Sequence, residues 1–285
     1  LGPRFSVAPL FANFAAAYGE LANSEGVTPD IAQMVQQLAG SIREMGEGSN
    51  LLNGLVSSAL LHVPSLPLAG GLAAGRVIEI ASAGEAAVWW LLFGLLGLLI
   101  GVLYLTLLAR RLPIGGMAGA GPSQVTVAVF RHWLQVIGFV ILVAVGLLLV
   151  YLPFSLLVGL VMMFSSALGS ALAALAGAIT LVVFFYLYFV TAALIMDHVT
   201  LPAAMLRSLR LVRENFWATL GLLLLTNLIT LGIALLLLQM AALALWASLV
   251  AIALNAYIGT GLSMALLVFY RTRLIKGAEA AVVAQ

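Results

Sequence analysis

The stretch that decides the fold is Val88–Leu108, which reads VWWLLFGLLGLLIGVLYLTLL. It contains no acidic or basic side chain, and a membrane-spanning helix needs about 20 consecutive apolar residues to cross the hydrocarbon core. Trp89 and Trp90 stand at one end, as aromatic residues do at a membrane interface. Arg110 and Arg111 close the other end. The stretch therefore predicts a transmembrane helix over residues 88–108.

The composition of the whole chain agrees with a membrane protein. Of its 285 residues, 64% are hydrophobic and 8% are charged, whereas soluble domains average about 45–50% apolar and about 25% charged residues. This balance excludes a water-soluble globular protein, and also a disordered chain, which needs much charge and few apolar residues. The chain has no cysteine, which excludes a disulfide framework, a zinc–thiolate site and a cysteine nucleophile.

Two further charge-free runs are each long enough for a pair of spans. One covers the 65 residues between Arg131 and Asp197, and the other covers the 56 residues between Glu214 and Arg271. Each run can hold two helices and a turn, because a helix rises about 1.5 Å per residue and the hydrocarbon core is about 30 Å thick. The four helices are expected near Leu134–Met163, Ala171–Met196, Phe216–Leu238 and Leu243–Tyr270.

The basic residues favour two spans in each run. Lys and Arg concentrate in short cytoplasmic loops, and two spans per run place every basic residue after residue 88 on one side. A third span in the longer run would split them. Residues 88–285 contain nine basic and three acidic residues, and residues 1–87 contain three basic and seven acidic ones. We therefore expect residues 1–87 outside and the C-terminus inside, in a bacterial cytoplasmic membrane.

The predicted fold is an all-α, polytopic transmembrane helix bundle with five spans in this chain. The chain starts outside with Leu1, without an initiator Met or a recognisable signal peptide, so we expect one upstream span in the intact protein, making six. Phe11–Tyr18 is apolar but too short to span, and is interpreted as the end of that helix. The basic residues follow topology and do not cluster on a soluble face, so nucleic-acid binding is not expected.

Five regions follow from this layout. They are a helical, acidic extracytoplasmic segment at 1–87, the first span at 88–108, an interfacial helix with a transmembrane hairpin at 109–196, a basic interfacial helix with a second hairpin at 197–270, and a cytoplasmic tail at 271–285. The two hairpin regions read as a repeat, because His132–Gly138 matches Asn215–Gly221 in pattern. Pro153 falls inside the first hairpin, where it removes a backbone hydrogen bond and predicts a kink.

One amphipathic helix is predicted within residues 1–87. Thr28 can cap it and Pro29 fits its first turn. Between Ile31 and Met45, apolar residues recur at helical spacing opposite a polar face. A second helix is expected over Asn50–Val63. We expect this outer segment to cover the extracytoplasmic ends of the bundle; the alternatives are a helix lying on the membrane surface and a docking site for a partner.

The segment before the second hairpin predicts an interfacial amphipathic helix that begins at Thr200 and Pro202. Its apolar side chains share one narrow arc, and its basic side chains take the other side, as in helices that lie in the membrane interface. The apolar positions are Leu201, Met205, Leu209, Val212 and Phe216. The basic positions, interpreted as candidate lipid-headgroup contacts, are Arg207, Arg210 and Arg213.

This segment also resembles a known family. The stretch Asp197–Trp217, DHVTLPAAMLRSLRLVRENFW, followed by an apolar run, is similar to bacterial multi-pass proteins of the glycerophosphoryl diester phosphodiesterase membrane-domain-like family. In that family, an acidic residue at the end of a span precedes a helix that contains Ala, Ser and an Asn-Phe-Trp triplet. In this sequence the corresponding residues are Ala204, Ser208 and Asn215–Trp217. The resemblance implies a multi-pass membrane region over 88–285. It implies no phosphodiesterase activity, because this sequence lacks the catalytic domain.

The sequence contains no recognisable catalytic or metal-binding constellation, neither a nucleophile elbow nor a phosphate loop. Asp197 and His198 are neighbours, but adjacent side chains on a helix point about 100° apart, so they form no dyad by sequence. We interpret Asp197 as ending a span and pairing with Arg207 or Arg210; the alternative is a headgroup or ion site at the inner interface. The histidines, none in a metal-ligand spacing, are His62, His132 and His198.

Two polar residues lie deep in the predicted spans, Asn227 and Asn255. We interpret them as an interhelical amide pair; an intramembrane contact to a polar substrate is the alternative. The middle of the spans carries no acidic or basic residue, which argues against a proton-coupled carrier. A small-residue pair at Gly259 and Ser263 indicates close helix packing.

The leading functional hypothesis is a non-enzymatic integral membrane protein that serves as a lipid-associated or scaffold module. Its expected partners are membrane lipids, with anionic headgroups at the cytoplasmic face, and no cofactor is expected. One alternative is a carrier or channel for a small or lipid-like solute, motivated by the repeat, Pro153 and the two asparagines. Another is a subunit of a larger membrane complex, and a homo-oligomer also fits the sequence. An enzyme ranks last.

Overall fold

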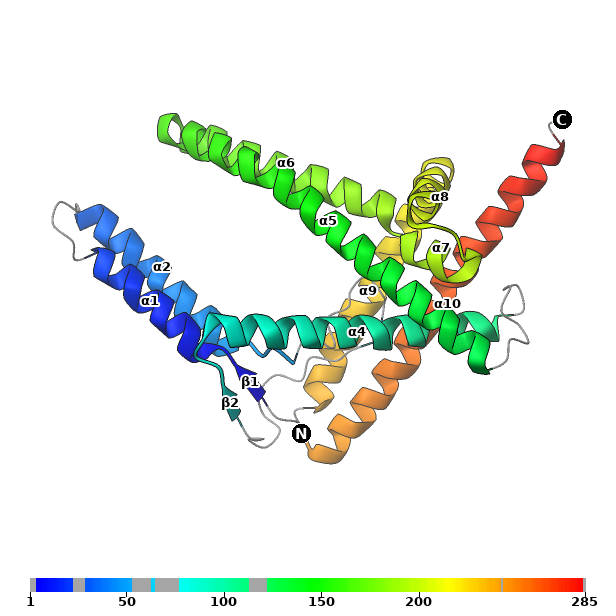
Figure 1. The fold of residues 1–285 in the computed structure, drawn as a ribbon, viewed down its shortest axis with the longest axis horizontal. Helices are drawn as coiled ribbons and strands as arrows, with labels where there is room; N and C mark the ends of the chain where they lie inside the picture. Colours follow the sequence, from blue (N-terminus) through cyan, green and yellow to red (C-terminus); the bar gives the residue numbers. More distant parts are fainter. Residues whose placement is uncertain are drawn as a thin grey trace. The chain divides into compact units, whose positions relative to one another are not determined.

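Helices dominate the computed structural model, which describes residues 4–22, 29–52, 63–64, 77–112, 122–241 and 243–283 (Figure 1). The elements are β1 (Arg4–Ser6), α1 (Ala8–Ala22), α2 (Pro29–Gly48), β2 (Val77–Glu79), α4 (Ala83–Arg111), α5 (Pro122–Phe164), α6 (Ser166–Leu187), α7 (Val190–Asp197), α8 (Leu201–Glu214), α9 (Phe216–Ala241) and α10 (Leu245–Val283). The predicted all-α class is confirmed; the two strands are three residues each.

Five helical stretches of the described chain are long and apolar enough to cross a membrane. They are Ala83–Arg111, Gln124–Phe164, Ser166–Asp197, Phe216–Ala241 and Trp246–Lys276. Their number confirms the five predicted spans, and each contains most of the corresponding predicted range. Their length and composition identify a multi-pass membrane protein.

The chain divides into two compact units, which are described separately. The first consists of Leu1–Ser58, Ser65–Gly97 and Leu237–Ile252, and the second of Ala59–Pro64, Leu98–Leu236 and Ala253–Gln285.

In the first unit, β1 and β2 form a parallel ribbon that packs on the start of α4. The ring centroid of Phe5 in β1 lies 4.9 Å from that of Trp89 and 4.9 Å from that of Phe93. These separations are typical of packed aromatic pairs. The predicted interfacial tryptophan at position 89 therefore belongs to a small aromatic core at the beginning of the first span.

The helices α1 and α2 pack against each other in the same unit (Figure 1). Gly46 of α2 faces Phe11 of α1 so closely that an added Cβ would collide with the Phe11 side chain. The helix α2 confirms the predicted amphipathic helix, whereas its expected cap Thr28 lies outside the described residues. So does most of the helix expected over Asn50–Val63. The apolar stretch Phe11–Tyr18 lies within α1.

In the second unit, α5 runs without a break from Pro122 to Phe164, with Pro153 inside it. The predicted interfacial segment and the span predicted over Leu134–Met163 therefore lie in one continuous helix. The turn between α5 and α6 is a single residue, Ser165, whose side chain accepts a hydrogen bond from the Leu168 backbone N–H. The connection is therefore shorter than the gap between the predicted helices, which ended at Met163 and resumed at Ala171, because Ser165 caps the next helix at once.

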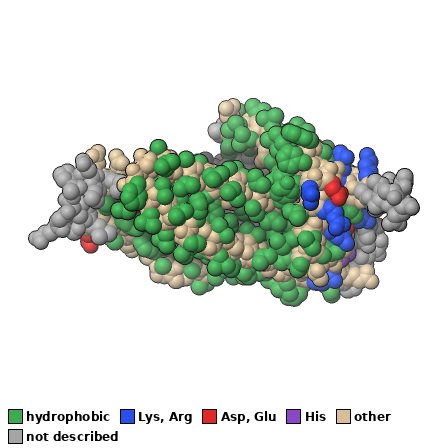
Figure 2. All heavy atoms as spheres, turned by 90° about the horizontal axis from the view of Figure 1, so that it is seen from above, with side chains coloured by type: hydrophobic (Ala, Val, Ile, Leu, Met, Phe, Trp, Pro, Cys, Tyr) green, Lys and Arg blue, Asp and Glu red, His purple; other side chains and the backbone are tan. Residues whose placement is uncertain are grey.

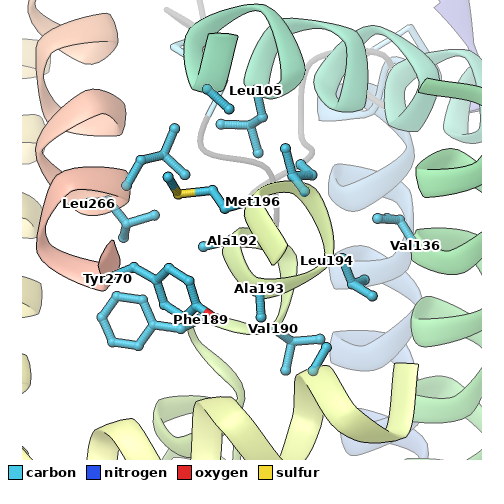
Figure 3. Close-up of a cluster of buried hydrophobic side chains, with 14 of the residues drawn as sticks. Leu105, Val136, Phe189, Val190, Ala192, Ala193, Leu194, Met196, Leu266 and Tyr270 are labelled. Atoms are coloured by element: carbon cyan, nitrogen blue, oxygen red, sulfur yellow. The ribbon is translucent and has the colours of Figure 1, made fainter. Parts of the chain in front are cut away.

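The span predicted over Ala171–Met196 is divided at Tyr188 and Phe189 into α6 and α7. Every residue from Val190 to Met196 is buried, as expected of a helix that is apolar on all sides. Figure 3 shows α7 among side chains from α4, α5 and α10, including Leu105, Val136 and Leu266. The core of this unit is thus built around a helix of eight residues.

Candidate functional site

The candidate site is the linker between α7 and α8, where charged and imidazole side chains from four helices meet. His198 follows the last residue of α7 and adopts a left-handed conformation, with φ 52° and ψ 29°. This conformation is uncommon for residues other than glycine, although His, Asn and Asp adopt it more often than the rest. It turns the chain out of α7 so that α8 can begin at Leu201, three residues later.

Asp197, at the end of α7, is the acidic centre of this linker. Its side chain is only 5% exposed. Oδ2 lies 2.6 Å from Nη1 of Arg207 and accepts a hydrogen bond of 2.5 Å from the Tyr270 hydroxyl, while Oδ1 lies 3.0 Å from Nη1 of Arg271. The hydrogen bond to Asp197 raises the pKa of Arg207. The two arginines and the tyrosine offset the desolvation penalty of the buried carboxylate. Through these contacts Asp197 joins α7 to α8 and α10.

This arrangement confirms one of the two predicted partners of Asp197. The carboxylate pairs with Arg207 and not with Arg210. Its other partners, Tyr270 and Arg271, were not predicted. They lie 73 and 74 residues away in the chain, and only the packing of α10 brings them to the carboxylate.

His132 of α5 pairs with His198. Nε2 of His132 lies 2.9 Å from Nδ1 of His198, and the two rings stack with centroids 4.9 Å apart and an interplanar angle of 13°. His132 is fully buried. Two of its neighbours on α5 bind the linker backbone: Arg131 donates to the carbonyl of His198 at 3.3 Å, and Gln135 donates to that of Val199 at 3.1 Å.

The sequence did not predict the histidine pair. Burial, and then the positive charge of Arg131, lower the pKa of His198, while Asp197 opposes them. The only sequence signal was the cluster of polar residues at 131, 132 and 135 at the start of a strongly apolar helix. Such a cluster marks a polar contact of that helix but does not identify its partner.

Ser208 of α8 binds the backbone groups at the break between α6 and α7. Its Oγ accepts a hydrogen bond of 3.1 Å from the Phe189 backbone N–H and donates one of 2.7 Å to the Tyr186 carbonyl. Ser208 is fully buried. Backbone groups released by a helix break must find partners when water is excluded, and a side chain from another helix supplies them here.

The helix α8 is amphipathic, as predicted, but its buried face differs from the predicted arc. The buried residues are Ala204, Ser208, Leu211 and Val212. Leu201 and Met205 pack partly against the core, whereas Leu209 is 46% exposed. The small side chains of Ala204 and Ser208 allow a close approach to α7, and this requirement outweighs the burial of Leu209.

The candidate headgroup residues fall into two groups. Arg207 is bound to Asp197, while Arg210 and Arg213 are exposed on α8. Leu206, on the same helix, is 66% exposed. Figure 2 shows Lys and Arg side chains gathered in one region of the visible face, beside a broad hydrophobic surface.

The two deep asparagines do not form the amide pair expected from the sequence. Asn227 donates a hydrogen bond of 2.8 Å to the Leu223 carbonyl of its own helix. Asn255 is partly buried, and no hydrogen bond joins it to Asn227 in the described part of the chain. Of the small-residue pair in α10, Gly259 lies against Pro64 with no room for a Cβ atom, and Pro64 lies outside the helices.

Among the residues that the structure describes, no three His, Cys, Asp or Glu side chains come together in a way that could hold a metal ion. No family model, curated protein or solved structure matches this chain. The resemblance of Asp197–Trp217 to the membrane-domain-like family therefore stays a prediction.

Proposed function

We propose that the protein is a non-enzymatic membrane module that associates with anionic phospholipid headgroups through α8. The observation that carries this proposal is the outward face of that helix. One side of α8 is buried in the second unit, and the other exposes Leu206 and Leu209 together with Arg210 and Arg213. Exposed leucines and arginines on one helix are typical of a helix that lies in the membrane interface.

The exposed residues supply both components of lipid binding. Leucine side chains gain free energy by entering the region of the acyl chains, while arginine side chains extend their charged heads toward the headgroups. A guanidinium group can bind a phosphate through two parallel hydrogen bonds. Trp217, at the start of α9, is 80% exposed and suits the same interface.

The orientation follows from the distribution of arginines. We propose that the linker, α8 and the C-terminus face the cytoplasm of a bacterial cell, and that residues 1–87 lie outside. The basic residues then meet the leaflet in which anionic lipids attract Lys and Arg. Because Arg207 is held by Asp197, Arg210 and Arg213 are the main headgroup contacts in this proposal.

The double replacement Arg210→Gln with Arg213→Gln is expected to reduce the enrichment of phosphatidylglycerol on the protein by about tenfold or more. Each arginine near an anionic surface contributes about 1 kcal/mol. The measurement is native mass spectrometry of protein released from nanodiscs that contain equal amounts of phosphatidylglycerol and phosphatidylcholine.

The matched control is Arg43→Gln, which removes the same charge from an exposed position on α2 in the first unit. It should leave the enrichment unchanged. An unaltered preference for phosphatidylglycerol in the double variant, or an equal loss in the control, would contradict a headgroup site on α8. Double replacement by Lys should retain part of the enrichment, because charge remains while the bidentate geometry is lost.

A further inference from the structure

The contact between His132 and His198 limits how many protons the two rings can hold. Four ring nitrogens are present, and two of them face each other at 2.9 Å. A contact of that length accommodates one hydrogen. Two neutral imidazoles carry two hydrogens in total, so one lies in the contact and the other occupies an outer nitrogen.

A hydrogen on Nδ1 of His132, the ring nitrogen that faces away from His198, is energetically unfavourable. Nδ1 of His132 is buried and has no hydrogen-bond partner among the described residues. An N–H group there would be unsatisfied in the core, which is costly. The neutral pair avoids this cost by placing its second hydrogen on Nε2 of His198. A third hydrogen must occupy Nδ1 of His132, whichever ring carries the charge.

The charged groups around the two rings also disfavour an added proton. Arg131 lies next to His132 on α5 and binds the carbonyl of His198. Asp197 would favour a charged imidazole, but its carboxylate already binds two arginines and a tyrosine, which come from α8 and α10. Burial and Arg131 together outweigh Asp197, so the pKa of His198 lies below its ordinary value.

We propose that the His132–His198 pair is a pH-sensitive latch, which holds the linker between α7 and α8 on α5 when neutral and releases it on protonation. The released rings reach solvent and titrate normally, at about pH 6.5. The closed state therefore loses stability as the pH falls below about 6.5. This inference rests on the linker geometry and does not depend on lipid binding by α8.

Proton linkage sets the size of the effect. If both rings stay neutral in the closed state and titrate normally in the open state, acidification from pH 7.5 to pH 5 shifts the equilibrium toward the open state by up to about a thousandfold. The shift toward the open state is smaller if one of the two rings already binds a proton in the closed state.

The test uses two spin labels, for which the cysteine-free chain is suited without further change. One label replaces Val127, which is 71% exposed on α5. The other replaces Thr200, which is exposed and makes no capping hydrogen bond through its side chain. The distance between the labels is measured by electron–electron double resonance in nanodiscs at pH 7.5 and pH 5. We expect one narrow distribution at pH 7.5 and a second, broader population at pH 5.

A control pair places both labels on α5, at Val127 and at Leu149, which is also 71% exposed. Its distance should not change with pH. A Val127–Thr200 distance that is equal at both pH values would overturn the latch. So would a change in both label pairs, because that result indicates general acid unfolding.

The variant His198→Asn connects the effect to the imidazoles. Asn tolerates the left-handed conformation and does not titrate. Only His132 then titrates, so the shift toward the open state between pH 7.5 and pH 5 should fall from up to about a thousandfold to at most about thirtyfold. If the acid-induced population is as large in this variant as in the parent, the histidine pair is not the sensor. If His198→Asn does not fold, the variant His132→Gln is compared with the parent in the same way, and its acid-induced population should also be smaller.

Discussion

Replacing Asp197 with Asn is expected to lower the thermal unfolding midpoint of the protein in mild detergent by about 5 °C. This shift corresponds to about 3 kcal/mol for a chain of 285 residues. The carboxylate binds two guanidinium groups and a hydroxyl, and an amide cannot neutralise either cation. The cost lies at the low end of that for breaking a buried ion pair, because the side chains of Arg207 and Arg271 are 42% and 28% exposed.

The partners of Asp197 provide a graded comparison. Arg271→Gln should destabilise more than Arg207→Gln, because Arg271 is the less exposed of the two. The matched control is Arg210→Gln, which removes the same charge from an exposed position on the same helix as Arg207. If Asp197→Asn unfolds at the same temperature as this control, the contacts of Asp197 do not stabilise the fold.

Replacing Ser208 with Ala is expected to cost about 2–4 kcal/mol, because it removes the side-chain partner of one buried and one partly buried backbone group, each at about 1–3 kcal/mol. These groups are the N–H of Phe189 and the carbonyl of Tyr186. The unfolding midpoint should fall, and hydrogen exchange at the Phe189 amide should become faster. The second measurement is specific to the break between α6 and α7, whereas a general loss of packing would spread over the unit.

Ser170→Ala is the control for this prediction. Its hydroxyl also donates to a backbone carbonyl, that of Ser166 at 2.8 Å, but within its own exposed helix. The change should be nearly neutral for stability. Equal effects of the two alanine variants, or an unchanged exchange rate at Phe189 in Ser208→Ala, would show that the serine does not support the break.

The membrane architecture could be predicted because it depends on local composition. A run of apolar residues without charge, such as Val88–Leu108, must be helical to satisfy its backbone in lipid. The beginning of α8 could be predicted for the same reason, because Thr200 and Pro202 are local signals. The predicted interfacial segment and the span after it lie in one helix, α5, because a continuous helix satisfies the backbone groups of both.

The candidate site could be predicted only in part, because its contacts join distant parts of the chain. The sequence predicted the acidic end of a span and its pairing with either Arg207 or Arg210, whereas the choice of Arg207 and the contribution of α10 depend on tertiary packing. No Gly or Pro at Tyr188 and Phe189 predicts the break between α6 and α7. The break depends on Ser208, which lies on α8. The burial of His132 likewise depends on a partner from another helix.

The short helix α7 has a consequence for the order in which the protein assembles. Its neighbours include α4, which is synthesised before it, and α10, which is synthesised after it. The partners of its terminal carboxylate are completed only by Tyr270 and Arg271. During synthesis, α6 and α7 can enter the membrane as one span, but the carboxylate of Asp197 lacks its partners on α10 until the last span is made. A ribosome-bound chain that ends before residue 270 therefore presents an unfinished core, and this is the stage at which we expect membrane chaperones and proteases to recognise it.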